Sequence, residues 1–257
     1  MKGMILAAGE GQRLRPLTDH LPKPMLPIAG RPLLEHTILH LRDCGVTDLA
    51  INLYYLPTVI MDYFGSGSRW GVHLRYSVEE RLMGSAGGVK YLQSFFADDT
   101  FVVYYGDVFT QADLRLMVAF HRRAGALATM GLYRVPDPWN RGIVQLDNSD
   151  TIVRFVEKPS RDQVFSDLAN AGIYVLEPEV LDRIPAGRVY DFGNDVFPKM
   201  LAEGARIAGY VIEDALIDIG LPEKYMEANR IACIDCRQPI MDIADLPPAS
   251  TSVRDTL

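Results

Sequence analysis

The chain has 257 residues, a formal net charge of −7 at pH 7, and 48% hydrophobic residues. This length suits one large domain, and the composition is that of a soluble globular protein. Basic residues form no stripe, and no apolar run approaches the roughly 20 residues of a membrane span, so neither nucleic acid nor a membrane is expected as a partner. The absence of a secretory signal and the sparse, odd number of cysteines favour a cytoplasmic protein.

The first informative segment is residues 4–27, M-I-L-A-A-G-E-G-Q-R-L-R-P-L-T-D-H-L-P-K-P-M-L-P. A strand-like run, residues 4–8, leads into G-E-G-Q, where two glycines allow backbone N–H groups to point at a bound anion. Arg13 and Lys23 bring positive charge to the same anion, and the prolines on both sides of Lys23 hold it in place. The segment therefore predicts a cradle for a triphosphate.

Two common glycine loops do not match this segment. A dinucleotide fingerprint requires glycine where Leu14 stands, and a Walker loop requires a Gly-Lys-Ser/Thr triplet that the sequence lacks. From Leu6 to Pro24 the chain instead follows L-A-A-G-x-G-x-R-L-x-P-L-T-x-x-x-P-K-P at every fixed position. This order resembles the signature of the sugar-1-phosphate nucleotidyltransferases, also called nucleotide-sugar pyrophosphorylases. An ordinary strand-to-loop turn with surface cations is the alternative interpretation.

Strand-like and helix-like segments alternate through the first half of the chain. Strands are predicted at 48–52, 72–77, 101–105 and 128–133, and helices at 32–44, 59–64, 85–95 and 114–124. This alternation indicates a Rossmann-like three-layer α/β/α fold, with a mainly parallel mixed sheet covered on both faces. Ligands bind beyond the carboxyl ends of such strands, so the glycine cradle and Asp107 are expected to share one cleft.

The second half is expected to extend the sheet and form the far wall of the cleft. Strands are predicted at 143–146, 152–156, 171–176 and 207–212, and helices near 179–184, 195–203 and 222–236. We therefore predict one domain, residues 1–236, with a nucleotide-binding half at 1–134 and a sugar-phosphate-binding half at 135–236. Residues 237–257, rich in proline, serine and threonine, are predicted to form a loose tail.

Asp107 and Asp218 are the candidates for a metal site. Asp107 follows a β-rich run and a glycine that allows close approach, and Asp218 stands in a short apolar run that ends in glycine. Because Mg²⁺ prefers few carboxylates plus phosphate oxygens, two aspartates and a triphosphate suffice. The family resemblance implies magnesium binding for Asp107, and a turn or cap role is the alternative for each aspartate.

The motif F-V-E-K-P resembles the family's sugar-phosphate site, which implies that Lys158 contacts the phosphate and that Glu157 accepts sugar hydroxyls. Asn170 and Gly172 stand in a segment that resembles the family's further sugar contacts. Gly142 resembles the glycine against which the hexose lies. For these last two segments, a plain turn into a strand remains the alternative.

The turn E-R-L-M-G-S-A-G-G, which starts at Glu80, is predicted to read the base. Gly84 begins a glycine-rich turn into a helix, so backbone groups can face the base edge. Guanylyl-transferring relatives carry a similar E-x-P-L-G-T-A-G, which favours GTP, whereas uridylyl- and cytidylyl-transferring relatives have comparable turns. The predicted nucleotide contacts are Leu6, Ala7, Ala8, Gly9, Glu10, Gly11, Gln12, Arg13, Lys23, Glu80, Gly84, Ser85 and Asp107.

The resemblance implies Mg²⁺-dependent transfer of a nucleotidyl group from an NTP to a sugar-1-phosphate, giving pyrophosphate and an NDP-sugar that serves as a polysaccharide precursor. The attacking phosphate oxygen is already ionised at neutral pH, so positioning and charge neutralisation must supply the rate. GTP with a mannose- or heptose-type sugar is the predicted pair. Uridylyl, thymidylyl or cytidylyl transfer and a non-catalytic nucleotide-sugar sensor are the alternatives, and a homo-oligomer is left open. The predicted catalytic residues are Arg13, Lys23, Asp107, Lys158 and Asp218.

Overall fold

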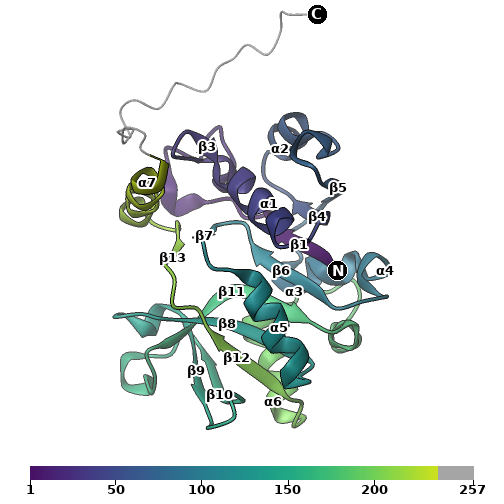
Figure 1. Cartoon of the computed structure of the whole chain (residues 1–257), viewed down its shortest axis with the longest axis vertical. Helices are drawn as coiled ribbons and strands as arrows, with labels where there is room; N and C mark the ends of the chain where they lie inside the picture. The colour runs from purple at the N-terminus through teal and green to yellow at the C-terminus, as the bar shows by residue number, and fades with distance from the viewer. Residues whose placement is uncertain (237–257) are drawn as a thin grey trace, which may run out of the picture.

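The structure is a computed structural model that describes residues 1–236, and its centre is a nine-stranded mixed sheet (Figure 1). The strands of this sheet are β1 Lys2–Leu6, β4 Asp48–Leu53, β5 His73–Val78, β6 Phe101–Tyr105, β8 Ala128–Arg134, β9 Gly142–Leu146, β10 Ile152–Glu157, β11 Leu168–Leu176 and β12 Ile207–Val211. Their order is β10-β9-β11-β6-β1-β4-β5, with β8 paired to β11 and β12 paired to β8.

The first half of the sheet is parallel and brings the ends of its strands together. β1 lies between β4 and β6, with Leu6 opposite Asn52 on one side and Tyr105 on the other. These strands are mostly buried, as expected where helices cover both faces. The residues that follow β1 and β6, among them Asp107, therefore emerge at the same edge of the sheet, as the sequence predicts.

The second half of the sheet is mostly antiparallel. β11 runs antiparallel to β6 and β8, and β9 pairs with β10 so that Gly142 lies opposite Glu157. β11 begins before the predicted residue 171 because its first residues pair with β8, ahead of an irregularity between Asn170 and Tyr174. Gly172 lies in this irregularity with a φ of 70°, a conformation that favours glycine.

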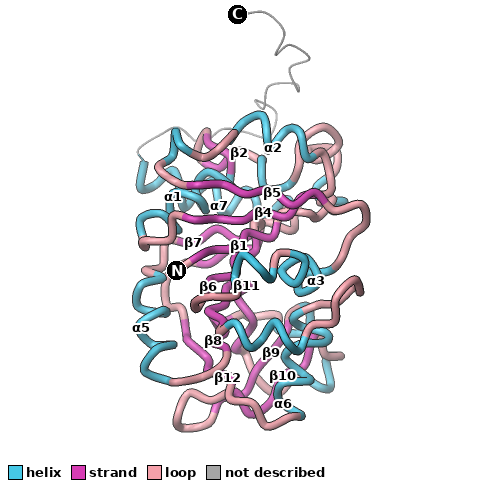
Figure 2. The backbone as a smooth tube through the Cα atoms, turned by 90° about the vertical axis from the view of Figure 1, so that its right-hand side faces the viewer, coloured by secondary structure: helices cyan, strands magenta, loops and turns pink. Residues whose placement is uncertain are grey.

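Helices cover both faces of the sheet, so the predicted three-layer α/β/α arrangement is confirmed (Figure 2). One face carries α1 Leu33–Asp43, α2 Pro57–Phe64 and α5 Leu114–Ala124. The other face carries α3 Gly84–Tyr91, α4 Gln93–Phe96 and α6 Phe197–Ala202. Side chains alternate along each strand, so Ile5 packs in the first of these two cores and its neighbour Met4 in the second.

Three predicted helices differ from those in the structure. The predicted helix 85–95 is divided into α3 and α4, because Leu92 leaves the helical backbone and its N–H bonds to the carbonyl of Val89. Residues predicted as a helix near 179–184 form a 3₁₀ helix, and a π-helical turn precedes α6. The short helical turns are Gln12–Leu14, Lys23–Met25, Ser68–Trp70, Pro138–Asn140, Arg161–Gln163, Pro178–Arg183 and Phe192–Val196.

A smaller layer packs against the glycine cradle. It comprises β2 Pro27–Ile28, β3 Arg31–Pro32, β7 Val108–Thr110, β13 Leu216–Asp218 and α7 Pro222–Cys236. β13 pairs antiparallel with β7, which directly follows Asp107. On α7, Tyr225 packs with Leu14 and Leu26 in a third buried cluster and donates a hydrogen bond to the carbonyl of Pro27 at 2.7 Å. These contacts hold the end of β13 beside the end of β6.

The sequence also predicts that no segment spans a membrane and that the last residues form a loose tail. Among the described residues, no helix is both long enough and apolar enough to cross a membrane. The predicted tail, 237–257, lies outside the residues that the structure describes.

Candidate active site

The segment after β1 folds into a tight glycine loop. Gly11 has a φ of 65°, and a Cβ there would lie 3.0 Å from side-chain atoms of both Lys23 and Thr18. Thr18 Oγ1 donates a hydrogen bond to the carbonyl of Gly11 at 2.9 Å. At Gly9, in contrast, a Cβ would meet open space. The loop itself therefore requires Gly11, and the backbone at Gly9 stays accessible to a ligand.

A cavity of about 280 Å³, called here the smaller cavity, opens beside this loop at the ends of β1, β4 and β6. It contains most of the predicted nucleotide contacts, namely Leu6, Ala7, Ala8, Gly9, Lys23, Gly84, Ser85 and Asp107.

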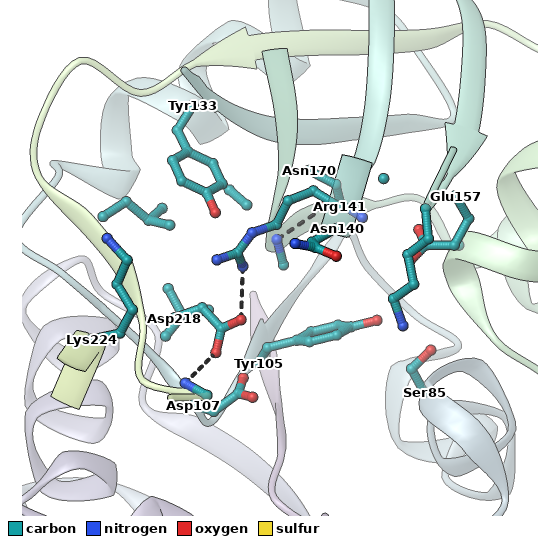
Figure 3. A pocket seen from close by; sticks show the side chains of 18 of the residues that line it. Ser85, Tyr105, Asp107, Tyr133, Asn140, Arg141, Glu157, Asn170, Asp218 and Lys224 are labelled. Carbon is teal, nitrogen blue, oxygen red and sulfur yellow. Dashed lines mark hydrogen bonds and ion pairs between the residues drawn. The ribbon is translucent and has the colours of Figure 1, made fainter. Parts of the chain in front are cut away.

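A second cavity of about 600 Å³, called here the larger cavity, shares Ser85, Tyr105 and Asp107 with the smaller one (Figure 3). It brings together the predicted residues Arg13, Gly142, Glu157, Lys158, Asn170, Gly172 and Asp218. The two cavities thus meet at Asp107, and residues from both halves of the chain line the larger one.

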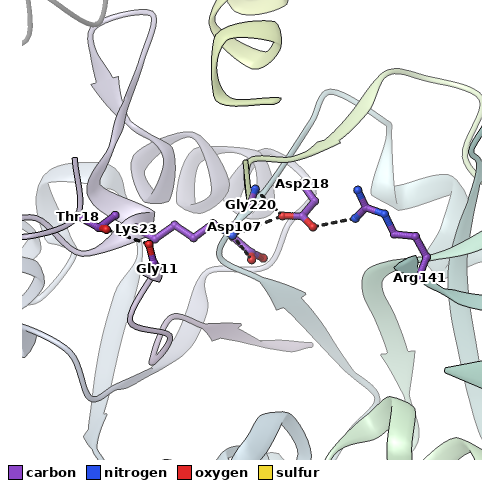
Figure 4. A network of polar contacts seen from close by, with 7 residues as sticks. All are labelled: Gly11, Thr18, Lys23, Asp107, Arg141, Asp218 and Gly220. Atoms are coloured by element: carbon purple, nitrogen blue, oxygen red, sulfur yellow. Dashed lines mark hydrogen bonds and ion pairs between the residues drawn. The ribbon is translucent and has the colours of Figure 1, made fainter. Parts of the chain in front are cut away.

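A network of alternating charges lies where the cavities meet (Figure 4). Lys23, whose side chain is 9% exposed, donates a hydrogen bond from Nζ to Asp107 Oδ2 at 2.6 Å and to Asp218 Oδ1 at 3.4 Å. Arg141 Nη1 donates to Asp218 Oδ2 at 2.7 Å, and the backbone N–H of Gly220 donates to Asp218 Oδ1 at 2.9 Å. A buried lysine needs such counter-charges, because desolvation disfavours an unpaired ammonium.

The charges around Asp218 also determine its protonation. Burial raises the pKa of this carboxyl, but the charges of Lys23 and Arg141 and the hydrogen bonds from Arg141 and Gly220 lower it. The net effect is a pKa below the ordinary value, so Asp218 is ionised at neutral pH.

The two aspartates fit a magnesium ion that is shared with a phosphate ligand. Asp107 and Asp218 retain 32% and 25% side-chain exposure and line the same cavity. Among the side chains that the structure describes, no group of three or more from His, Cys, Asp or Glu gathers around a common point. Mg²⁺ is commonly held by one or two carboxylates plus substrate phosphates and water, which matches this donor set.

Glu157 and Lys158 lie at the end of β10. A Cβ on Gly142 would lie 2.5 Å from Glu157 Oε2, and one on Gly193 would lie 2.6 Å from it, so two glycines make room for this carboxylate. Burial raises the pKa of Glu157, with Asp191 adding to the rise and Lys158 opposing it. Lys158 has a φ of 45°, an uncommon left-handed conformation for a side-chain-bearing residue, and such strain is frequent at ligand sites.

Asn170 lines the larger cavity, but the protein itself already engages its amide. Its Nδ2 donates a hydrogen bond to Tyr174 Oη at 2.8 Å, and its Oδ1 accepts one from the backbone N–H of Gly172 at 2.9 Å. A Cβ on Gly172 would lie 3.0 Å from the ring of Tyr105. These two residues therefore shape the wall next to Tyr105.

Four predicted nucleotide contacts, Glu10, Gly11, Gln12 and Glu80, line neither cavity. Gln12 Nε2 instead donates to Glu10 Oε2, and Glu80 is exposed.

The acidic residue on the wall of the smaller cavity is Glu79, which is 9% exposed. Its Oε1 accepts a hydrogen bond from Asn52 Nδ2 at 2.9 Å, and its Oε2 accepts one from the backbone N–H of Met83 at 3.0 Å. Strand alternation could have identified it, because Ser77 and Glu79 point inward while Val78 and Glu80 are exposed.

The sequence alone did not identify several further charged residues of the larger cavity, namely Asp137, Arg141, Asp191 and Lys224. Arg141 had a local signal, since it directly precedes the predicted site residue Gly142. Lys224 had none, because its place beside the cavity depends on how α7 packs against the cradle.

Comparison with known proteins points to one enzyme family. The pattern of the nucleotidyl transferase family matches residues 2–233. The chain is 41% identical to UTP–glucose-1-phosphate uridylyltransferase of Synechocystis sp. and 40% identical to mannose-1-phosphate guanylyltransferase of Mycobacterium tuberculosis. These matches cover 90% and 88% of this chain, and the chain spans 63% of the length of each of these relatives.

A solved structure agrees with the fold. The putative glucose-1-phosphate thymidylyltransferase from Bacillus anthracis, in complex with a sucrose, has a TM-score of 0.83 to this chain at 28% identity. The match covers 90% of this chain and 95% of that chain.

Proposed function

Because the chain belongs to the nucleotidyl transferase family, we propose that it transfers a nucleotidyl group from an NTP to a sugar-1-phosphate, with NDP-sugar and pyrophosphate as products. The observation that carries this proposal is the meeting of two cavities at Asp107, beside the network of Lys23, Asp218 and Arg141. A two-substrate transfer needs two binding sites that share one reaction centre, and polyanionic substrates need cations at that centre.

In this reaction an oxygen of the sugar phosphate forms a bond to the α-phosphorus of the NTP. The bond from the α-phosphorus to its bridging oxygen breaks, and pyrophosphate leaves. The attacking oxygen is already ionised at neutral pH, so the protein needs neither a general base nor a covalent nucleophile. Its task is to align the two phosphates and to neutralise their charge.

The lining residues suit these tasks. The loop at Gly9, with Arg13 and Lys23, would bind the β- and γ-phosphates, and Lys23 would neutralise charge as pyrophosphate leaves. Lys158 would orient the sugar phosphate, and Glu157 would accept hydrogen bonds from sugar hydroxyls. Asp107 and Asp218 would hold Mg²⁺, which when bound neutralises charge on the phosphate oxygens.

We also propose GTP and a mannose- or heptose-type sugar-1-phosphate as the substrate pair. Guanine presents N1–H and N2–H₂ donors, and Glu79 brings acceptor oxygens to the wall of the smaller cavity. Similarity to the Mycobacterium tuberculosis guanylyltransferase favours this pair, and similarity to the Synechocystis uridylyltransferase makes UTP with glucose-1-phosphate the second candidate. A non-catalytic sensor is disfavoured because Arg13, Lys23 and both aspartates are retained. The substrates and the net charge of −7 suit a cytoplasmic enzyme without a nucleic-acid partner.

The test is pyrophosphate release with GTP, UTP, CTP, dTTP and ATP, each combined with mannose-1-phosphate and glucose-1-phosphate. GTP with mannose-1-phosphate is expected to give the highest kcat/KM. If a pyrimidine nucleotide gives the highest kcat/KM with both sugar phosphates, the base assignment is wrong, but the reaction class is still supported. Absence of pyrophosphate release for every pair would contradict the reaction class.

A further inference from the structure

Two cationic residues, Arg141 and Lys158, lie where β9 begins and β10 ends. The backbone N–H of Lys158 donates to the carbonyl of Arg141 at 3.0 Å, one step beyond the Gly142–Glu157 pair of the ladder. Both residues line the larger cavity. A phosphate bound in this cavity would therefore have two cationic residues on the same wall.

Arg141 is restrained by Asp218. Its side chain is 22% exposed, and Nη1 donates to Asp218 Oδ2 at 2.7 Å. Within the described chain this is the one hydrogen bond that the guanidinium makes, although the group has five N–H donors. Figure 3 shows the side chain reaching across the cavity to this carboxylate. Its remaining donors are therefore available to a ligand in the larger cavity.

Asp218 is the point where several cations compete. It already accepts hydrogen bonds from Lys23, Arg141 and the backbone N–H of Gly220. A divalent ion bound by the same carboxylate would weaken its attraction for Arg141, because one negative charge would then be shared with a stronger cation. Metal binding at Asp218 would thus free the guanidinium.

We propose that Arg141 binds the phosphate of the sugar-1-phosphate, and that Asp218, while no metal ion is bound to its carboxylate, restrains this arginine. Arginine suits this role because its planar fork matches two phosphate oxygens at once. The proposal rests on the proposed function. It implies that sugar-phosphate affinity depends on the charge of Asp218 even where no metal is present.

The experiment is calorimetric titration of the full chain with mannose-1-phosphate, and in parallel with glucose-1-phosphate, in excess EDTA. Asp218→Asn is expected to tighten binding about tenfold, because it releases Arg141. Asp107→Asn is the matched control, since it also removes one negative charge from the cavity but does not contact Arg141. It is expected to change the affinity by less than about threefold. Adding Arg141→Gln to Asp218→Asn is expected to remove the gain.

An equal increase in sugar-phosphate affinity in the two aspartate variants would overturn the proposal, because the loss of one negative charge would then explain both increases. A gain that survives Arg141→Gln would overturn it as well. Thermal melts of every variant check folding, and Arg141→Lys, which keeps the charge without the fork, is expected to retain only part of the gain. Pyrophosphate release by the wild-type protein separates the two hypotheses, because an active enzyme with equal gains retains its proposed function and loses the role of Arg141.

Discussion

The smaller and the larger cavity differ in what their polar side chains already bind. In the smaller cavity, Asn52 and Glu79 are hydrogen-bonded to each other, and the backbone N–H groups of Ala7 and Met83 hold their remaining oxygens. In the larger cavity, the carboxylate of Glu157 accepts no hydrogen bond from any described residue, and Arg141 pairs with Asp218 on a facing element. A wall fixed in advance suits selection of a base by its shape and its hydrogen-bond donors, whereas exchangeable ion pairs suit the capture of phosphates.

The junction between the cavities provides the largest predicted effect. Asp107→Asn is expected to lower kcat by about a thousandfold or more, because in the proposed site this carboxylate would hold the metal that neutralises charge on the α-phosphate and on the leaving pyrophosphate. EDTA is expected to abolish wild-type turnover. Steady-state pyrophosphate release measures both effects, with the thermal melt as a folding control. Turnover that persists in excess chelator would rule out a metal at this junction.

Two lysines separate the roles of the cavities. Lys23→Ala is expected to lower kcat by about a hundredfold or more, because charge grows on the leaving pyrophosphate during the reaction. Lys158→Ala is expected mainly to raise the KM for the sugar phosphate, whose charge it meets in the ground state. The two variants are matched controls for each other, since each removes one ammonium. Identical kinetic profiles would show that the cavities do not divide the substrates in this way.

The fixed wall of the smaller cavity can be tested with two neighbouring glutamates. Glu79→Gln is expected to lower kcat/KM for the preferred NTP by about tenfold or more. The amide offers one acceptor oxygen instead of two, and a buried N–H of the base that loses its acceptor costs about 1–3 kcal/mol. Glu80→Gln, at the exposed neighbour, is the control and is expected to leave kcat/KM unchanged. If Glu80→Gln has the larger effect on discrimination among the five NTPs, Glu80 contacts the base, as the sequence predicts, and Glu79 does not.

The smallest predicted effect concerns stability and pH. The pKa of Asp218 is lowered in the folded protein, so its ionisation stabilises the fold above the unfolded-state pKa near 3.9. Asp218→Asn is therefore expected to lower the free energy of unfolding by about 1–3 kcal/mol at pH 7. This difference should shrink as the pH falls below about 4, through the lowered pKa of the folded state. Urea unfolding at several pH values measures it, and a constant difference down to pH 3 would contradict the pairing.

The sequence predicts the structure best where residues close together in the chain determine it. The strand at 101–105 and the helix at 114–124 have the predicted bounds, because periodicity and the flanking glycine and aspartate mark them. The glycine loop, Lys23 and Asp107 are brought together as expected, because parallel strands end at the same edge.

The remaining features depend on tertiary contacts that no local pattern encodes. The pairing of β13 with β7, which puts Asp218 beside Asp107, joins segments far apart in the chain. Arg141 and Lys224 reach the larger cavity through the same long-range packing. The sequence predicts Glu80 as the base contact, but Glu79 lines the cavity for a local reason. The alternation of β5 continues past Val78, so Glu79 points inward and Glu80 is exposed.

In the proposed reaction, the two cavities hold the two parts of one product. The most direct measurement is a crystal structure of the protein with Mg²⁺ and the NDP-sugar that it forms. The account predicts the nucleoside in the smaller cavity beside Glu79, the sugar in the larger cavity beside Glu157, and the diphosphate next to Asp107 and Asp218. A product with its base in the larger cavity, or with both parts in one cavity, would contradict the account.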